Sequence, residues 1–309
     1  MDWAYKAALT AAVVAALLAV AMRWGRSTAG LLAGLPTVTG PALVWLSVDQ
    51  GVVFATHAAV GAVAAAAPCA LFAWGYACGA ARSGQRLGGL LAGAAPAALA
   101  AWAIVGLLEF LLESAPGAAP WRSTAATAAL AGLVLVPVSL VCLACLASLR
   151  QPGGTAATAG TALTAATAGA LRCGWARAIV PTAAVSGLVS ALAGLLAPQV
   201  GALWAGMLTS PPLLAAALAW LLHGQGGLTA ARQFLRGYTV GLLGRNGFAV
   251  AFGALLAPVG VCGAAGGGVA LALLGTWAFT RVLRLPEMRG LATHDDELTN
   301  RPGSRLARS

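Results

Sequence analysis

Charged residues are scarce in this sequence of 309 amino acids. They make up 8% of the chain, whereas 60% is hydrophobic, and a soluble domain carries about one quarter charged residues. This scarcity predicts an all-α, polytopic membrane protein. The charges are also unbalanced, with 18 Lys and Arg against 8 Asp and Glu. Because the arginines are scattered between apolar runs rather than gathered on one face, we interpret them as topology signals. We expect membrane lipid, and no nucleic acid, as a partner.

The groups that carry enzyme chemistry are lacking as well. The chain has three histidines, and it contains no Ser/His/Asp grouping, no metal-ligand spacing and no phosphate-binding loop. The six cysteines lie in or beside apolar runs, and Cys142 and Cys145 have no histidine or carboxylate near them in sequence. We interpret the cysteines as small buried hydrophobes rather than metal or redox ligands. The sequence therefore predicts no enzyme, no cofactor and no metal site.

Long apolar runs, in contrast, fill most of the chain. A helix needs about 20 apolar residues to cross the hydrocarbon layer. This rule predicts nine spans, at residues 3–22, 28–48, 52–80, 87–110, 123–148, 176–197, 200–222, 233–256 and 258–280. Arginines follow the odd-numbered spans, whereas the opposite side holds little beyond Lys6 and Arg122. By the positive-inside rule, the N-terminus lies outside and the C-terminus lies in the cytoplasm.

Two stretches of the sequence match at a constant shift of 175 residues. The matched pairs include Pro36 with Pro211, Trp45 with Trp220, Gln50 with Gln225 and Gly51 with Gly226. We interpret the match as a duplication, and because five spans precede the second copy, we expect it to be inverted in the membrane. The predicted organisation is a first repeat of five spans at 1–150, a Gly/Thr/Ala-rich linker at 151–172, a second, inverted repeat of four spans at 173–283 and a cytoplasmic tail at 284–309.

The matched stretches interrupt two predicted spans near their centres. Proline removes a backbone donor, and in lipid the freed carbonyl groups must find partners in the protein or in a water-lined cavity. Transporters built from inverted repeats place their substrate site between such broken helices. We expect the same here, with substrate-binding residues Pro36, Thr37, Thr39, Gly40, Thr209, Ser210 and Pro211. The alternative is a pair of tolerated kinks whose hydroxyl groups bond back to carbonyl oxygens.

Ionisable residues inside the spans extend this predicted site. Arg245 lies near the middle of span eight, next to Asn246, and His57 lies inside span three. An arginine at the bilayer centre costs about 2.5–3.5 kcal/mol, and no carboxylate is expected at its depth. We therefore add Arg245, Asn246 and His57 to the predicted substrate-binding residues. For His57, a hydrogen bond between helices is the alternative to proton transfer.

The broken segments also carry a resemblance to a known family. "AGLLAGLPTVTGPALVWLSVDQG" and its echo "AGMLTSPPLLAAALAWLLHGQGG" resemble the small GlpM-like bacterial inner-membrane proteins. The chain looks like two such units fused, over roughly residues 1–112 and 173–283, and this resemblance implies a bacterial inner-membrane location. A looser likeness is to the drug/metabolite transporter superfamily, which has five-plus-five inverted repeats.

Together these features predict a secondary transporter or exporter of a small anionic metabolite, with a midplane site between two broken helices. The alternative is a non-transporting inner-membrane subunit of an assembly or polysaccharide-export system. Transport predicts that polar residues of both halves converge on one cavity. The accessory subunit predicts a closed core and an apolar, partner-facing groove on the outside.

Overall fold

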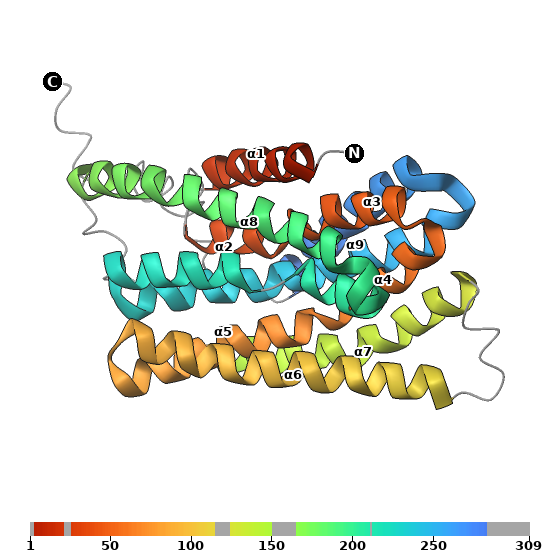
Figure 1. The fold of residues 1–309 in the computed structure, drawn as a ribbon. Coiled ribbons are helices and arrows are strands. Elements are labelled where there is room, and N and C mark those ends of the chain that lie inside the picture. Colours follow the sequence, from red (N-terminus) through yellow and green to blue (C-terminus); the bar gives the residue numbers. More distant parts are fainter. Residues whose placement is uncertain (1–2, 22–25, 115–123, 150–164, 211, 283–309) are drawn as a thin grey trace, which may run out of the picture.

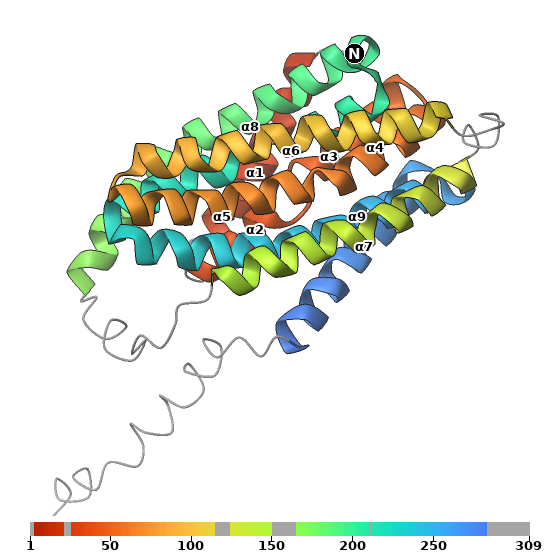
Figure 2. The ribbon, with the colours of Figure 1, turned by 90° about the horizontal axis from the view of Figure 1, so that it is seen from below.

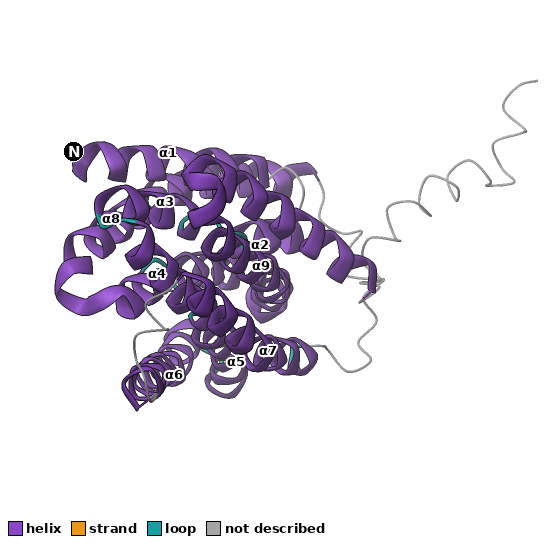
Figure 3. Ribbon diagram, turned by 90° about the vertical axis from the view of Figure 1, so that its right-hand side faces the viewer, coloured by secondary structure: helices purple, strands orange, loops and turns teal. Residues whose placement is uncertain are grey.

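The computed structural model describes residues 3–21, 26–114, 124–149, 165–210 and 212–282, and these residues form helices and short breaks without any strand (Figure 3). The helices are α1 (Trp3–Ala21), α2 (Arg26–Gly34), α3 (Thr39–Asp49), α4 (Val52–Ala64), α5 (Ala66–Ser83), α6 (Arg86–Ser114), α7 (Thr124–Ser148), α8 (Ala165–Leu208) and α9 (Leu213–Val282). The all-α prediction is therefore confirmed. α8 begins inside the segment expected as a linker, of which residues 151–164 lie outside the described part.

Five apolar, largely helical stretches of the described residues are long enough to cross a membrane, and two of them contain the breaks between α2 and α3 and between α8 and α9. They are Ala29–Asp49, Val52–Ser83, Arg86–Leu111, Leu130–Ser148 and Gly194–Phe279. One crossing takes about 20 residues, so the last of these, with 86 residues, is far longer than a single crossing. Helix length and hydropathy together make this a multi-pass membrane protein.

The two longest helices bend at glycines. α8 has non-helical backbone at Gly201 (φ 81°), and α9 has it at Gly226–Gly227 and at Gly260 (φ 72°). Gly201, Gly227 and Gly260 adopt positive φ, which costs glycine little because it has no Cβ. Two of the expected span boundaries, at residues 200 and 258, fall within two residues of these bends.

The helices lie roughly side by side along one direction, with α1 against α8 on one flank and α5 against α6 on the other (Figures 1 and 2). α2 packs along α9, and α4 packs against both α8 and α9. α7 lies against α4, α5 and α9. Helices from the first and last thirds of the chain therefore interleave, and the breaks of α2–α3 and α8–α9 lie within this shared interior.

Close contacts between the two halves of the chain occur in corresponding pairs, in which the half that supplies the glycine is exchanged. An added Cβ at Gly30 would overlap the carbonyl oxygen of Phe234, and one at Gly206 would overlap that of Ala58. Gly206 follows Gly30 by 176 residues, and Phe234 follows Ala58 by 176 residues. Arg245 follows Cys69 by the same number of residues.

The contact of Gly61 with Leu203 and that of Gly237 with Ser27 are related in the same way. The positive-φ glycines Gly51 and Gly84 have counterparts at Gly227 and Gly260. Residues that correspond in space are therefore 176 positions apart in the chain, whereas the two sequence stretches match at a shift of 175.

Candidate functional site

Two helix breaks meet in the interior. α2 ends at Gly34 and α3 begins at Thr39, while α8 ends at Leu208 and α9 begins at Leu213. A hydrogen bond of 2.6 Å joins Thr39 Oγ1 to Ser210 Oγ across the two breaks. Both hydroxyl groups are buried, so the breaks are tied directly to each other within the protein.

Arg245 in α9 lies beside these breaks. Its side chain is only 4% exposed, and its Nη1 donates to Cys69 Sγ at 3.9 Å. Cys69 in turn donates to the carbonyl oxygen of Ser210 at 3.1 Å. Arg245 Nε and Nη2 have no hydrogen-bond partner. A buried N–H group without a partner costs about 1–3 kcal/mol, and more when it is charged, so this guanidinium has hydrogen-bonding capacity that its protein neighbours do not fill.

A cavity of about 30 Å³ adjoins the guanidinium, and we call it the Arg245 cavity. A single water needs roughly 10–15 Å³ on the same measure, so the space suits two waters or one small polyatomic anion. Its lining residues come from both breaks and the helices around them: Ala33, Leu35, Thr37, Val38, Thr39, Ser186, Val189, Thr209, Ser210, Leu213, Leu214, Tyr238 and Arg245.

The electrostatics of this cavity favour an anion. The N-terminal ends of α3 and α9 contribute Thr39 and Leu213 to its wall, and a helix N-terminus carries a partial positive charge of roughly half an elementary charge. Arg245 adds a full positive charge. Among the described carboxylates, Asp49 pairs with Lys6 in a bond between α3 and α1, and none pairs with Arg245.

The structure brings together five of the residues predicted for the site. The cavity is lined by Thr37, Thr39, Thr209, Ser210 and Arg245. Pro36 and Gly40 lie instead along an adjoining apolar groove. Pro211 lies outside the described residues.

The other two predicted residues do not line the cavity. Asn246 is fully buried, and both polar atoms of its amide lack a partner. His57 is half-buried on α4, where Nδ1 lies 2.8 Å from the carbonyl oxygen of Val53 on the same helix.

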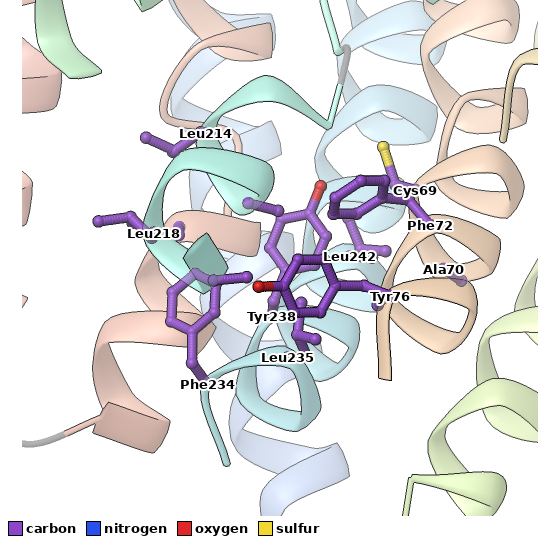
Figure 4. Packing of buried hydrophobic residues seen from close by; sticks show 14 of the residues in the cluster. Cys69, Ala70, Phe72, Tyr76, Leu214, Leu218, Phe234, Leu235, Tyr238 and Leu242 are labelled. Atoms are coloured by element: carbon purple, nitrogen blue, oxygen red, sulfur yellow. The ribbon is translucent and has the colours of Figure 1, made fainter. Parts of the chain in front are cut away.

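Sequence reasoning missed Cys69, Tyr238 and Ser186 as members of this region. Figure 4 shows Cys69, Phe72 and Tyr76 of α5 facing Tyr238 and Leu242 of α9. Tyr238 is one of only three tyrosines in the chain and precedes Arg245 by seven residues, which places both on one helix face. The sequence spacing to Arg245 could have placed Tyr238 near the site. A cysteine in an apolar run gives no such indication for Cys69.

The adjoining apolar groove has a volume of about 570 Å³. It runs between α1, the α2–α3 break and the second half of α9, and its lining residues are Leu9, Val13, Leu32, Leu35, Pro36, Thr37, Gly40, Pro41, Val44, Trp45, Phe248, Ala265, Val269, Ala272 and Leu273. Leu35 and Thr37 line both this groove and the Arg245 cavity. The first helix break therefore forms a common wall.

Comparison of the chain with family models, with curated proteins and with solved structures finds no match. The geometry of the site thus stands alone as a guide to function. Within the described residues, no group of three or more His, Cys, Asp or Glu side chains could hold a metal ion.

Proposed function

We propose that this protein is a secondary transporter or exporter of a small anionic metabolite, which binds at the Arg245 cavity between the two broken helices. The observation that carries the proposal is a buried guanidinium with two unpartnered groups, Nε and Nη2, beside a cavity lined by both breaks. In a membrane interior such a charge needs compensation. A bound anion supplies it, and one hydroxyl of the bonded pair Thr39 and Ser210 is a further donor.

The proposal includes an architecture of nine spans in an inverted repeat. The paired glycine contacts support the repeat, because a two-fold axis relating the halves would convert the contact of Gly30 with Phe234 into that of Gly206 with Ala58. With five spans before the second copy, that axis would lie in the membrane plane. The two repeats would then rock against each other around the fixed site, and the small glycine contacts are where their backbones approach.

The polar residues of the cavity are unevenly divided between the halves. At the separation of 176 residues, Arg245 corresponds to Cys69, and Ser210 corresponds to Gly34. We therefore assign anion binding mainly to the second repeat, while the first contributes Thr39 and the positive end of α3. The GlpM-like resemblance remains a prediction and names no substrate.

The experiment is metabolite profiling of cells that lack the protein, inside the cell and in the medium. Restoring the wild-type gene should restore the level of one anionic metabolite. Arg245→Gln should fail to restore it at equal protein level in the membrane, because the variant keeps the size and polarity but loses the charge. Arg232→Gln is the matched control, since it makes the same change on the same helix away from the cavity. Normal profiles with Arg245→Gln would refute the anion site.

One observation favours the accessory subunit as a second candidate. The apolar groove is the outward-facing feature that this alternative predicts, and a transmembrane helix of a partner protein could occupy it. That reading leaves the unpartnered guanidinium of Arg245 without a role, and for this reason we place it second.

A further inference from the structure

We infer that the apolar groove receives the aliphatic tail of a carboxylate whose headgroup binds in the Arg245 cavity. This inference rests on the proposed anion site and narrows its ligand to an amphiphilic carboxylic acid. The first step is size. At about 570 Å³, the groove falls within the range of roughly 300–1,000 Å³ that ligand pockets occupy, whereas the Arg245 cavity alone has room only for a small charged group.

The second step is the medium on which the groove opens. Its rim residues Leu9, Val13, Val269 and Leu273 are 41%, 37%, 48% and 55% exposed, and they lie on apolar helices. In a multi-pass membrane protein, such exposed aliphatic side chains face the hydrocarbon of the lipids. A molecule that enters from this side must be soluble in hydrocarbon, and an aliphatic chain meets that requirement.

The third step is the connection between groove and charge. Leu35 and Thr37 line both spaces, and the wall they form is a helix break rather than a continuous helix. A chain in the groove therefore lies next to the short segment that also borders the Arg245 cavity. In the inferred complex the chain passes this segment, so that its headgroup meets the guanidinium. The apolar lining offers an amphiphile no other charged partner, while Arg245 Nε and Nη2 lack one.

The fourth step is the choice of headgroup. Space for about two waters admits a carboxylate, whose two oxygens match the paired N–H groups of a guanidinium. A phosphodiester with its glycerol and second acyl chain is too large for this space. The ligand class is therefore a single-chain carboxylic acid and not a phospholipid.

The test measures binding of radiolabelled acetate and octanoate to the full-length protein in nanodiscs of zwitterionic lipid. Burial of a methylene group is worth about 0.8 kcal/mol, which converts to about fourfold in affinity for each fully buried methylene. Wild-type protein should bind octanoate at least tenfold more tightly than acetate. Val269→Trp, which fills the groove, should remove this advantage and leave acetate binding unchanged.

Two further variants complete the design. Leu274→Trp makes the same kind of change on the same helix, at a residue that is 62% exposed and outside the groove, and should alter neither affinity. Arg245→Gln should weaken binding of both acids at least tenfold.

Several outcomes would overturn the inference. Equal affinity of the wild-type protein for the two acids would exclude the tail site while leaving the proposed anion site intact. Octanoate binding that survives Val269→Trp would do the same. Octanoate binding that survives Arg245→Gln but not Val269→Trp would indicate that the groove holds an acyl chain without a role for the charge. If neither acid binds, this inference fails, and the metabolite profiles decide separately whether another anion is carried.

Discussion

At the scale of single residues, two of the hydroxyl groups at the breaks form a cross-link, while a third bonds locally. Thr209 Oγ1 donates back to the carbonyl oxygen of Gly206 at 2.7 Å, which is the tolerated-kink behaviour. Thr39 and Ser210 differ, because they bond to each other at 2.6 Å from opposite halves of the chain. One of these hydroxyls must accept, and Ser210 Oγ also lies 3.4 Å from Thr209 Oγ1.

This bond gives a prediction that a double-mutant cycle can check. Thr39→Val and Ser210→Ala should each destabilise the purified protein by about 1 kcal/mol, since each removes the short hydrogen bond between these two buried hydroxyls. The double variant should cost less than the sum of the two, with a coupling of roughly 0.5–1.5 kcal/mol. Thermal melting of all four proteins in the same detergent supplies the values. Strict additivity would show that the two hydroxyls do not interact.

At the scale of helices, the close approach of α2 to α9 and of α8 to α4 depends on glycine. Gly30 and Gly206 lie against backbone carbonyl oxygens, so no side chain fits between the helices. In membranes, where lipid tails are as apolar as leucine, such backbone approach is a main source of helix association.

Gly30→Ala and Gly206→Ala should therefore each destabilise the protein, by about 1–3 kcal/mol, because the neighbouring backbone must shift. The two effects should be similar in size, since the contacts correspond. Gly106→Ala on α6 is the control, because nothing lies within 4 Å of its added Cβ. It should raise the melting temperature, as alanine is about 1 kcal/mol better than glycine in a helix. A stable Gly206→Ala protein would contradict the packing described for α8 and α4.

How far the sequence predicted these elements depends on the kind of signal. Apolar run length predicted helices, and prolines predicted the breaks, because both act locally along the chain. Arg245 was predicted for the site because a charge in an apolar span needs compensation wherever it lies. Cys69 and Ser186 reach the region only through packing between distant helices, and a single sequence holds no local trace of that packing.

At the scale of the whole molecule, the nine-span scheme makes a direct topological prediction. An odd number of crossings puts the two termini on opposite sides of the membrane. A reporter that is active only in the cytoplasm should work when fused after Ser309 and fail when fused before Asp2, because the arginine-rich connections favour the cytoplasmic side. Immunoblots of both fusions control for expression. Activity of both reporters, or of neither, would rule out an odd span count.

The unequal residues at positions 69 and 245 have a consequence for energetics. An arginine belongs to one half of the molecule, while the corresponding place in the other half holds a cysteine. In the proposed transporter, a bound monovalent anion would cancel the charge of the arginine, so the loaded site would be neutral and the empty site would carry +1. A charge that crosses the full membrane voltage gains or loses about 2.3 kcal/mol per 100 mV. The membrane potential would then act on the return of the empty carrier and leave the loaded step almost untouched.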